Sequence, residues 1–221
     1  GEACNVFLGG NGQFAEVYIK DCNFHHAGTW GFLGSGTINK ITVINSNFEY
    51  NGQVDASHGN GFDLSGTSTN VLVDGGSFSY NTQAGINLMR ASNAVFKNFV
   101  ANNNGGAAGG GFGIKLDEWA GKSENILFEN FEASGNALDG ITIQPEKENA
   151  IENVTVRNAT LTNNGRNGVN LVYIYSGSNN PEMTNVTVTE CYIANNGGNG
   201  IYIWAWWVPG IFDGEYTFTD N

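Results

Sequence analysis

The sequence predicts an all-β fold, a single-stranded parallel β-solenoid of about eight coils. Three observations lead there: an internal repeat, apolar residues alternating with period two, and Gly and Asn recurring at fixed places in each repeat. The chain has 221 residues, of which 32 are Gly and 33 are Asn. Repeats of this kind cannot bury an apolar face alone, so they stack on their neighbours.

The repeat is marked by a triplet of an apolar residue, any residue and a second apolar residue, preceded by Gly or once by Asn. Successive triplets start 24 to 32 residues apart, which fits one coil of short strands and turns. The eight triplets begin at Val6, Phe32, Phe62, Ile86, Ile114, Ile141, Val169 and Ile201.

Two further sets of residues recur at equivalent positions in each coil. A second alternating segment usually follows an Asn, as at Asn125 and Asn153. A third apolar point is followed three residues later by a turn residue, which is Ala27 in the first coil and then Asn51, Asn81, Asn103, Asn136, Asn164 and Asn196. Asn tolerates left-handed backbone, and stacked Asn amides can bond one another. We therefore expect an Asn ladder along one edge of the solenoid.

Composition limits the partners. Apolar residues make up 40% of the chain, enough for a core, and the net charge is −12 with only nine Lys and Arg. That balance argues against nucleic acid and anionic membranes, and no apolar run reaches the ~20 residues of a membrane span. Cys4, Cys22 and Cys191 lack metal-type spacing and are expected to be free thiols. We expect no cofactor; calcium is left open, with no motif that indicates it.

Segments such as Asn164–Leu171 and Asn196–Ile203 resemble the right-handed parallel β-helix, the pectate-lyase-like superfamily. The resemblance covers nearly the whole chain, so residues 1–221 are expected to form one domain. It implies the fold and leaves the reaction open, because this fold hosts many reactions. Strand-like segments near both ends would leave open sheet edges. We therefore expect a section of a longer chain, or a homo-oligomer assembled end to end.

The middle residue of each triplet should point outward. This outward row reads Phe7, Leu33, Asp63, Asn87, Lys115, Thr142, Asn170 and Tyr202. A second row, two residues on, reads Gly9, Ser35, Ser65, Met89, Asp117, Gln144, Val172 and Trp204. Long loops at Gly52–Asn60 and Asn104–Phe112 should flank one side, and longer connections after the later triplets the other. Two walls and a polar floor predict a groove for a linear polysaccharide.

Two kinds of cleavage remain open. Asp63 and Asp117 are the best pair for hydrolysis, which needs one protonated and one ionised carboxyl; Glu118 and Glu146 are substitutes. For β-elimination on a uronic acid sugar, Lys115 and Arg90 would neutralise the carboxylate. His58 would then be the base and Tyr173 the acid.

Further candidates line the predicted groove. Trp and Tyr faces stack on sugars, yet an aromatic cluster can also serve as a subunit interface. The cluster comprises Trp119, Tyr173, Tyr175, Tyr202, Trp204, Trp206 and Trp207. The expected substrate-binding residues are Asn87, Glu118, Trp119, Thr142, Gln144, Asn170, Tyr173, Tyr175, Tyr202, Trp204 and Trp206.

Gly61-Phe62-Asp63 resembles alginate C5-epimerases, which continue with Pro-His-Glu where this chain has Leu64-Ser65-Gly66. The absence of that His argues against epimerisation. Polygalacturonase-type motifs are absent. We expect an extracellular or cell-surface protein that binds a polysaccharide and cleaves it by hydrolysis or β-elimination. The alternative is a non-catalytic adhesin, tailspike or sheath component.

Overall fold

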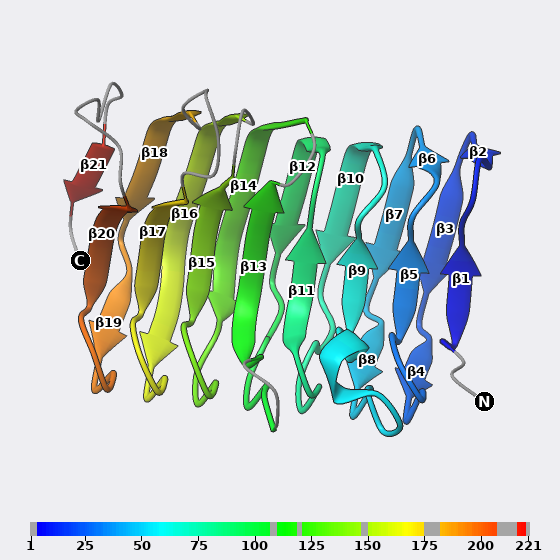
Figure 1. The fold of residues 1–221 in the computed structure, drawn as a ribbon, viewed down its shortest axis with the longest axis horizontal. Coiled ribbons are helices and arrows are strands. Elements are labelled where there is room, and N and C mark those ends of the chain that lie inside the picture. The colour runs from blue at the N-terminus through cyan, green and yellow to red at the C-terminus, as the bar shows by residue number, and fades with distance from the viewer. Residues whose placement is uncertain are drawn as a thin grey trace.

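The structure, a computed structural model, describes residues 4–106, 110–118, 121–146, 150–174, 182–206 and 216–219. It is a parallel β-helix in which successive coils lie side by side along one axis (Figure 1). Eight strands follow one another in the first sheet, so seven full turns separate the first from the last. The fold expected from the repeats is confirmed.

The first sheet carries the eight triplets. Its strands, in spatial order, are β1 (Val6–Leu8), β5 (Phe32–Gly34), β9 (Phe62–Leu64), β11 (Ala84–Leu88), β13 (Phe112–Glu118), β15 (Ile141–Pro145), β17 (Val169–Ile174) and β20 (Ile201–Trp206). Every neighbouring pair is parallel, and the triplets are in register throughout.

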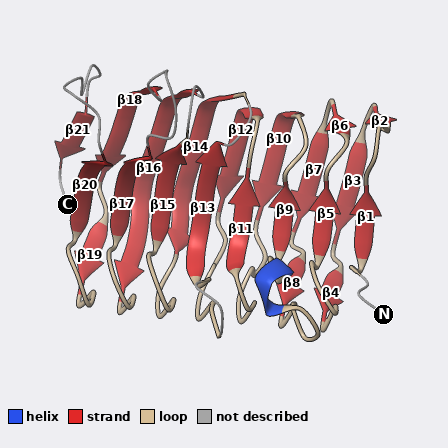
Figure 2. Cartoon of the chain, viewed as in Figure 1, coloured by secondary structure: helices blue, strands red, loops and turns tan. Residues whose placement is uncertain are grey.

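The second sheet has eleven strands. Its main path is β2 (Gln13–Phe14), β6 (Thr37–Ile38), β10 (Ser68–Asp74), β12 (Ala91–Lys97), β14 (Lys122–Glu132), β16 (Ala150–Thr162), β18 (Glu182–Thr189) and β21 (Tyr216–Thr219). Beside this path lie β3 (Val17–Lys20), β7 (Ile41–Ile44) and β19 (Tyr192–Ala194). A third sheet pairs β4 (Asn23–His25) with β8 (Asn47–Glu49). Figure 2 shows strands throughout and one short helix, η1 (Ala56–His58), beside β8.

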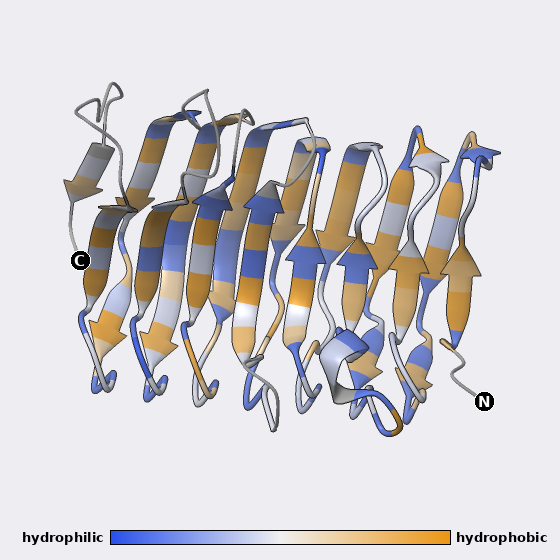
Figure 3. Cartoon of the chain, in the orientation of Figure 1, coloured by the Kyte–Doolittle hydropathy of each residue, from blue (hydrophilic) through white to orange (hydrophobic). Residues whose placement is uncertain are grey.

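The core runs the length of the solenoid between the sheets. It is built from stacked copies of the inward columns; Phe48 and Phe78, for example, stack with ring centroids 5.3 Å apart. Figure 3 shows β1 coloured as hydrophobic, whereas β9, β11 and β13 carry hydrophilic bands between hydrophobic ones. The outer face of the first sheet therefore changes from apolar to polar along the axis.

The Gly before six of the eight triplets is required by the close approach of the next coil; these are Gly31, Gly61, Gly85, Gly113, Gly140 and Gly168. A Cβ built on Gly113 would lie 2.5 Å from the Gly140 carbonyl oxygen, and one on Gly140 would lie 2.8 Å from the Gly168 oxygen. Real Cβ atoms essentially never come so close to backbone. A side chain at these positions would force the coils apart.

The Asn columns have two different structural roles. Asn70, Asn93, Asn125, Asn153 and Asn185 all have φ between 52° and 57°, the left-handed region that Asn tolerates better than most residues. A second, buried column forms a continuous amide ladder at the turn before the first sheet. Its members are Asn51, Asn81, Asn104, Asn136, Asn164 and Asn196.

One member of the predicted ladder was wrong. Asn104, and not Asn103, takes the ladder position, because the buried apolar residue of that coil is Ala101 instead of the half-buried Val100. Asn103 occupies the left-handed turn position, with φ 55°. Three consecutive Asn residues at 102–104 made the register ambiguous from the sequence alone.

Among the described residues, no helix is long and apolar enough to span a membrane.

Candidate functional site

The predicted outward row lies on the outer face of the first sheet. Asp63 pairs with Asn87, Asn87 with Lys115, and the register continues through Thr142 and Asn170 to Tyr202. The polar members are far less exposed than expected, however. Asp63, Asn87, Thr142 and Asn170 are each at most 5% exposed, because neighbouring rungs and the adjoining turns cover them.

The first hollow on this face, which we call the Asp63 pocket, has a volume of about 270 Å³. It spans three rungs, β9, β11 and β13, and the loop that contains η1. Its lining is Trp30, Ser57, His58, Asn60, Asp63, Ser65, Gln83, Ala84, Asn87, Met89, Phe112 and Lys115. The structure thus brings together four predicted site residues: His58, Asp63, Asn87 and Lys115.

Asp63 is a buried carboxyl on the floor of this pocket. Its Oδ2 accepts hydrogen bonds from Asn60 Nδ2 at 2.6 Å and Asn87 Nδ2 at 3.2 Å, while Oδ1 has no hydrogen-bond partner within the described chain. Burial raises the pKa of Asp63, and the nearby side chains of Asn60, Asn87, Ser65 and Trp30, which favour the ionised form, offset only part of that rise. This carboxyl therefore keeps its proton to a higher pH than an exposed aspartic acid.

The His58 imidazole is oriented by the carboxylate of Asp55. Its Nδ1 lies 2.7 Å from Asp55 Oδ2, and its ring packs against Trp30 with centroids 4.9 Å apart. Hydrogen bonds from Ser57 and His58 lower the pKa of Asp55 to about 2, so it is ionised at neutral pH. A carboxylate at Nδ1 fixes the tautomer that leaves Nε2 free of a proton. Asp55 was named in the sequence only as part of the long loop; its role as the partner of His58 was missed.

Lys115 and Asp117 form an ion pair on β13. Asp117 is almost fully buried and is absent from the lining of the Asp63 pocket, whereas the Lys115 side chain is a quarter exposed and lies over the Phe112 ring. The predicted pairing of Asp63 and Asp117 across one scissile bond is therefore not what the structure contains. Lys115 itself lines the Asp63 pocket while its ammonium pairs with Asp117.

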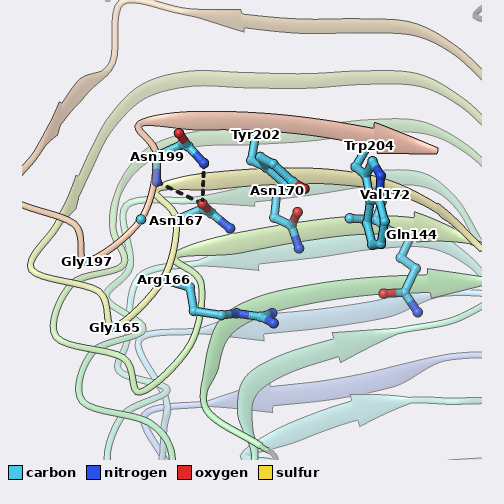
Figure 4. Close-up of a pocket in the computed structure, with 11 residues that line it drawn as sticks. Gln144, Gly165, Arg166, Asn167, Asn170, Val172, Gly197, Asn199, Tyr202 and Trp204 are labelled. Carbon is cyan, nitrogen blue, oxygen red and sulfur yellow. Dashed lines mark hydrogen bonds between the residues drawn. The ribbon is translucent and has the colours of Figure 1, made fainter. Parts of the chain in front are cut away.

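A second hollow on the same face, which we call the Trp204 pocket, has a volume of about 560 Å³ (Figure 4). It spans β15, β17 and β20 and the turns that precede β17 and β20. Its lining is Gln144, Gly165, Arg166, Asn167, Asn170, Val172, Gly197, Gly198, Asn199, Tyr202 and Trp204.

Asp139 lies beneath the Trp204 pocket and was missed in the sequence. It is fully buried and bound on both oxygens. Oδ1 accepts from the backbone and side-chain amides of Asn167, and Oδ2 accepts from Thr142, Arg166 and Asn170. The signal was available: Asp139 stands directly before Gly140, where other coils carry Asn60, Asn167 and Asn199.

Several predicted residues lie elsewhere. Arg90 donates to the Ser65 carbonyl oxygen and is absent from the lining of both pockets. Tyr173 was wrongly expected at the surface: period two turns it inward, and its hydroxyl donates to the Met183 carbonyl oxygen at 2.9 Å. Gln144 donates to Glu146 at 2.7 Å. Trp119, Tyr175 and Trp207 lie outside the described residues, as do the side chains of Glu118 and Trp206.

No cluster of three or more His, Cys, Asp or Glu side chains in the described ranges is arranged to hold a metal ion. Cys4, Cys22 and Cys191 are free thiols.

Comparison with known proteins identifies the family. The family model described as a right handed beta helix region matches residues 2–120 and 119–207, and the chain belongs to this family. Among solved structures, it is similar to the A-module of the mannuronan C-5 epimerase AlgE4 from Azotobacter vinelandii. The two share 15% identity with a TM-score of 0.50, over 91% of this chain and 63% of that one. That likeness is one of fold. No curated protein matches the sequence.

Proposed function

We propose that this protein binds a linear polysaccharide along the outer face of the first sheet and cleaves it at the Asp63 pocket by β-elimination. One observation carries the proposal. An imidazole oriented by a carboxylate, a buried carboxyl with a raised pKa and a lysine ammonium line a single pocket. These are the base, the acid and the cation that elimination from a uronic acid sugar requires.

The reaction follows from these roles. His58 Nε2 takes the proton from C5 of the uronate, and the electron pair forms the C4–C5 double bond as the C4–O4 bond breaks. Asp63 gives its proton to the departing oxygen, so the step balances. The Lys115 ammonium has three N–H donors, so it can keep its bond to Asp117 and donate another to the sugar carboxylate, whose negative charge grows as C5 is deprotonated. The Asn87 amide donates to the same carboxylate.

Hydrolysis is less well supported because it needs two carboxyl groups about the glycosidic bond. Asp117, the predicted second carboxyl, is paired with Lys115 and does not line the pocket. The neighbouring structure is named as an enzyme that acts at C-5 of mannuronan, which is consistent with proton abstraction at that carbon of a uronate polymer. We place the protein outside the cell or on its surface, where such polymers are met.

A non-catalytic role is the second candidate. Its support is the Trp204 pocket, where Tyr202 and Trp204 offer rings for binding and no acid–base pair is present among the lining residues. The protein would then be an adhesive or structural β-helix. Such a protein should self-associate into oligomers, which size-exclusion chromatography would detect.

A glycan screen separates these functions. The protein is incubated with uronate and neutral polysaccharides, and both reducing ends and the absorbance of unsaturated products are measured. Elimination produces both signals, hydrolysis produces reducing ends alone, and a binding protein produces neither. His58→Gln should abolish both signals, while His25→Gln, which removes an exposed His outside the pocket, should not. Loss of neither signal in His58→Gln would overturn the site assignment.

A further inference from the structure

We infer that the Trp204 pocket is a second sugar-binding site, which holds a unit of the same polysaccharide chain several rungs away from the site of cleavage. The inference rests on the proposed function for the identity of the ligand as a polysaccharide. It adds a binding site distinct from the Asp63 pocket, roles for Asp139 and Arg166 that the sequence did not reveal, and a minimum length of substrate.

The side chains of the Trp204 pocket match the chemistry of a sugar ring. Trp204 is 42% exposed, and Tyr202 is the neighbouring aromatic residue on β20, with ring centroids 6.4 Å apart. Aromatic faces pack against the C–H surface of a sugar, and polar groups beside them bind its hydroxyls. Arg166 and Gln144 supply such groups at the same hollow (Figure 4).

The polar part of the pocket is preorganised. Asp139 is fully buried and binds the Arg166 guanidinium and the Asn170 amide at once, so neither side chain is free to rotate away. Asn170 lies on the pocket floor, 95% buried, and its Oδ1 has no hydrogen-bond partner in the described chain. Because this oxygen is buried whereas Arg166 and Trp204 are about half exposed, we assign the first contacts with ligand to Arg166, Tyr202 and Trp204. Groups already fixed before binding cost less entropy when a ligand arrives.

The register sets the distance between the two sites. Asp63, Asn87, Lys115, Thr142 and Asn170 occupy five successive rungs in one column. At about 4.8 Å a rung, four steps place Asn170 about 19 Å from Asp63 along the axis. A polysaccharide lying along the sheet can fill both pockets, whereas a short fragment fills only one. Joining the two contacts through one chain raises the affinity without any new contact.

The test is a chain-length series measured by calorimetry. Oligomannuronates, oligogalacturonates and cello-oligosaccharides, each from dimers to dodecamers, are titrated into the wild type, Trp204→Ala and Arg166→Lys. Arg166→Lys keeps the charge opposite Asp139 and removes the guanidinium fork. Tyr192→Ala is the matched control, since it removes an aromatic ring of the preceding coil, on β19, that is 65% exposed and absent from the pocket lining.

We expect wild-type affinity for at least one series to rise at least about tenfold once the chain is long enough to reach both pockets. The rise should vanish in Trp204→Ala and shrink in Arg166→Lys, while Tyr192→Ala keeps it. In turnover assays the first two variants should raise KM for long chains and leave kcat unchanged. The inference is overturned if no series binds, if affinity is independent of length, or if Trp204→Ala binds long chains like the wild type.

The two proposals fail in different ways. A wild type that binds long chains through Trp204 but cleaves none would refute the proposed β-elimination and keep the second site. A protein that cleaves polysaccharide with the same KM in the wild type and Trp204→Ala would refute the second site and keep the cleavage.

Discussion

The two pockets on the outer face of the first sheet differ in how their buried carboxylates are bonded. Beneath the Trp204 pocket, Asp139 uses both oxygens and faces Arg166, Asn167, Asn170 and Thr142. At the Asp63 pocket, Asp63 has an oxygen without a hydrogen-bond partner among the described residues. A fully bonded carboxylate fixes its neighbours in place, and an under-bonded one keeps a shifted pKa and can exchange a proton. The difference is consistent with the separate roles, binding and cleavage, that we propose for the two pockets.

The largest effect, a loss of folding stability, should come from replacing Asp139, the fully hydrogen-bonded carboxylate. Asp139→Asn keeps the size of the side chain but replaces an acceptor with an amide donor that faces other donors, and it leaves Arg166 without its partner. The Arg166 side chain is half exposed and can be solvated, so the main cost is that the buried donors of Asn167, Asn170 and Thr142 lose an acceptor. We expect the free energy of unfolding to fall by about 3 kcal/mol. Urea denaturation of both proteins measures it. A change below about 1 kcal/mol would show that Asp139 is not the structural centre of this pocket.

The next effect concerns rate. His58→Gln should lower cleavage by about a hundredfold or more, because it removes the only imidazole that lines the Asp63 pocket. Binding of long chains through the Trp204 pocket should persist in the same variant. A parallel loss of binding and rate would mean that the two pockets do not have separate roles.

The smallest effect is a gain in folding stability, and it comes from replacing Asp63. Asp63→Asn should abolish proton donation and yet stabilise the protein by about 1–2 kcal/mol at pH 7. The raised pKa means that the folded state takes up a proton at Asp63 relative to the unfolded chain, so this residue lowers stability as the pH rises above the ordinary Asp value near 4. The gain should therefore be present at pH 7 and absent at pH 3. Thermal unfolding at both values tests this, and equal gains would contradict the assignment of a raised pKa.

The pH dependence of cleavage follows from the same residue. With Asp63 as the acid, the rate should fall as the pH rises through its raised pKa, because the carboxyl then loses the proton that the leaving oxygen needs. A rate profile from pH 4 to pH 9 measures the fall. Cleavage that keeps increasing over this range would remove Asp63 from the role of acid.

Much of the fold was predictable because it depends on repetition. Eight triplets, seven of them preceded by Gly, recur 24 to 32 residues apart, and only stacking in register buries their apolar residues. The same logic placed Asp63, Asn87 and Lys115 on successive rungs. Applied one residue beyond the outward Val172, the same alternation turns residue 173 inward, whereas Tyr173 was expected among the surface aromatics.

The details of the sites were harder to predict because they arise between coils. Asp139 meets Arg166 and Asn170 from the next coil, at sequence separations of 27 and 31 residues. These contacts cannot be read from local spacing, since they join residues of successive coils. The Lys115–Asp117 pair, in contrast, joins residues two apart on one face of β13, a spacing that favours such a pair.

The strict register of the first sheet also fixes the spacing of sites along the solenoid. Because every turn adds one rung, the separation of the two pockets can change only by whole coils, through duplication or loss of a repeat, and each pocket survives such an event intact. Lengthening the tube by one turn between β13 and β15 would therefore select a longer glycan without redesigning either site.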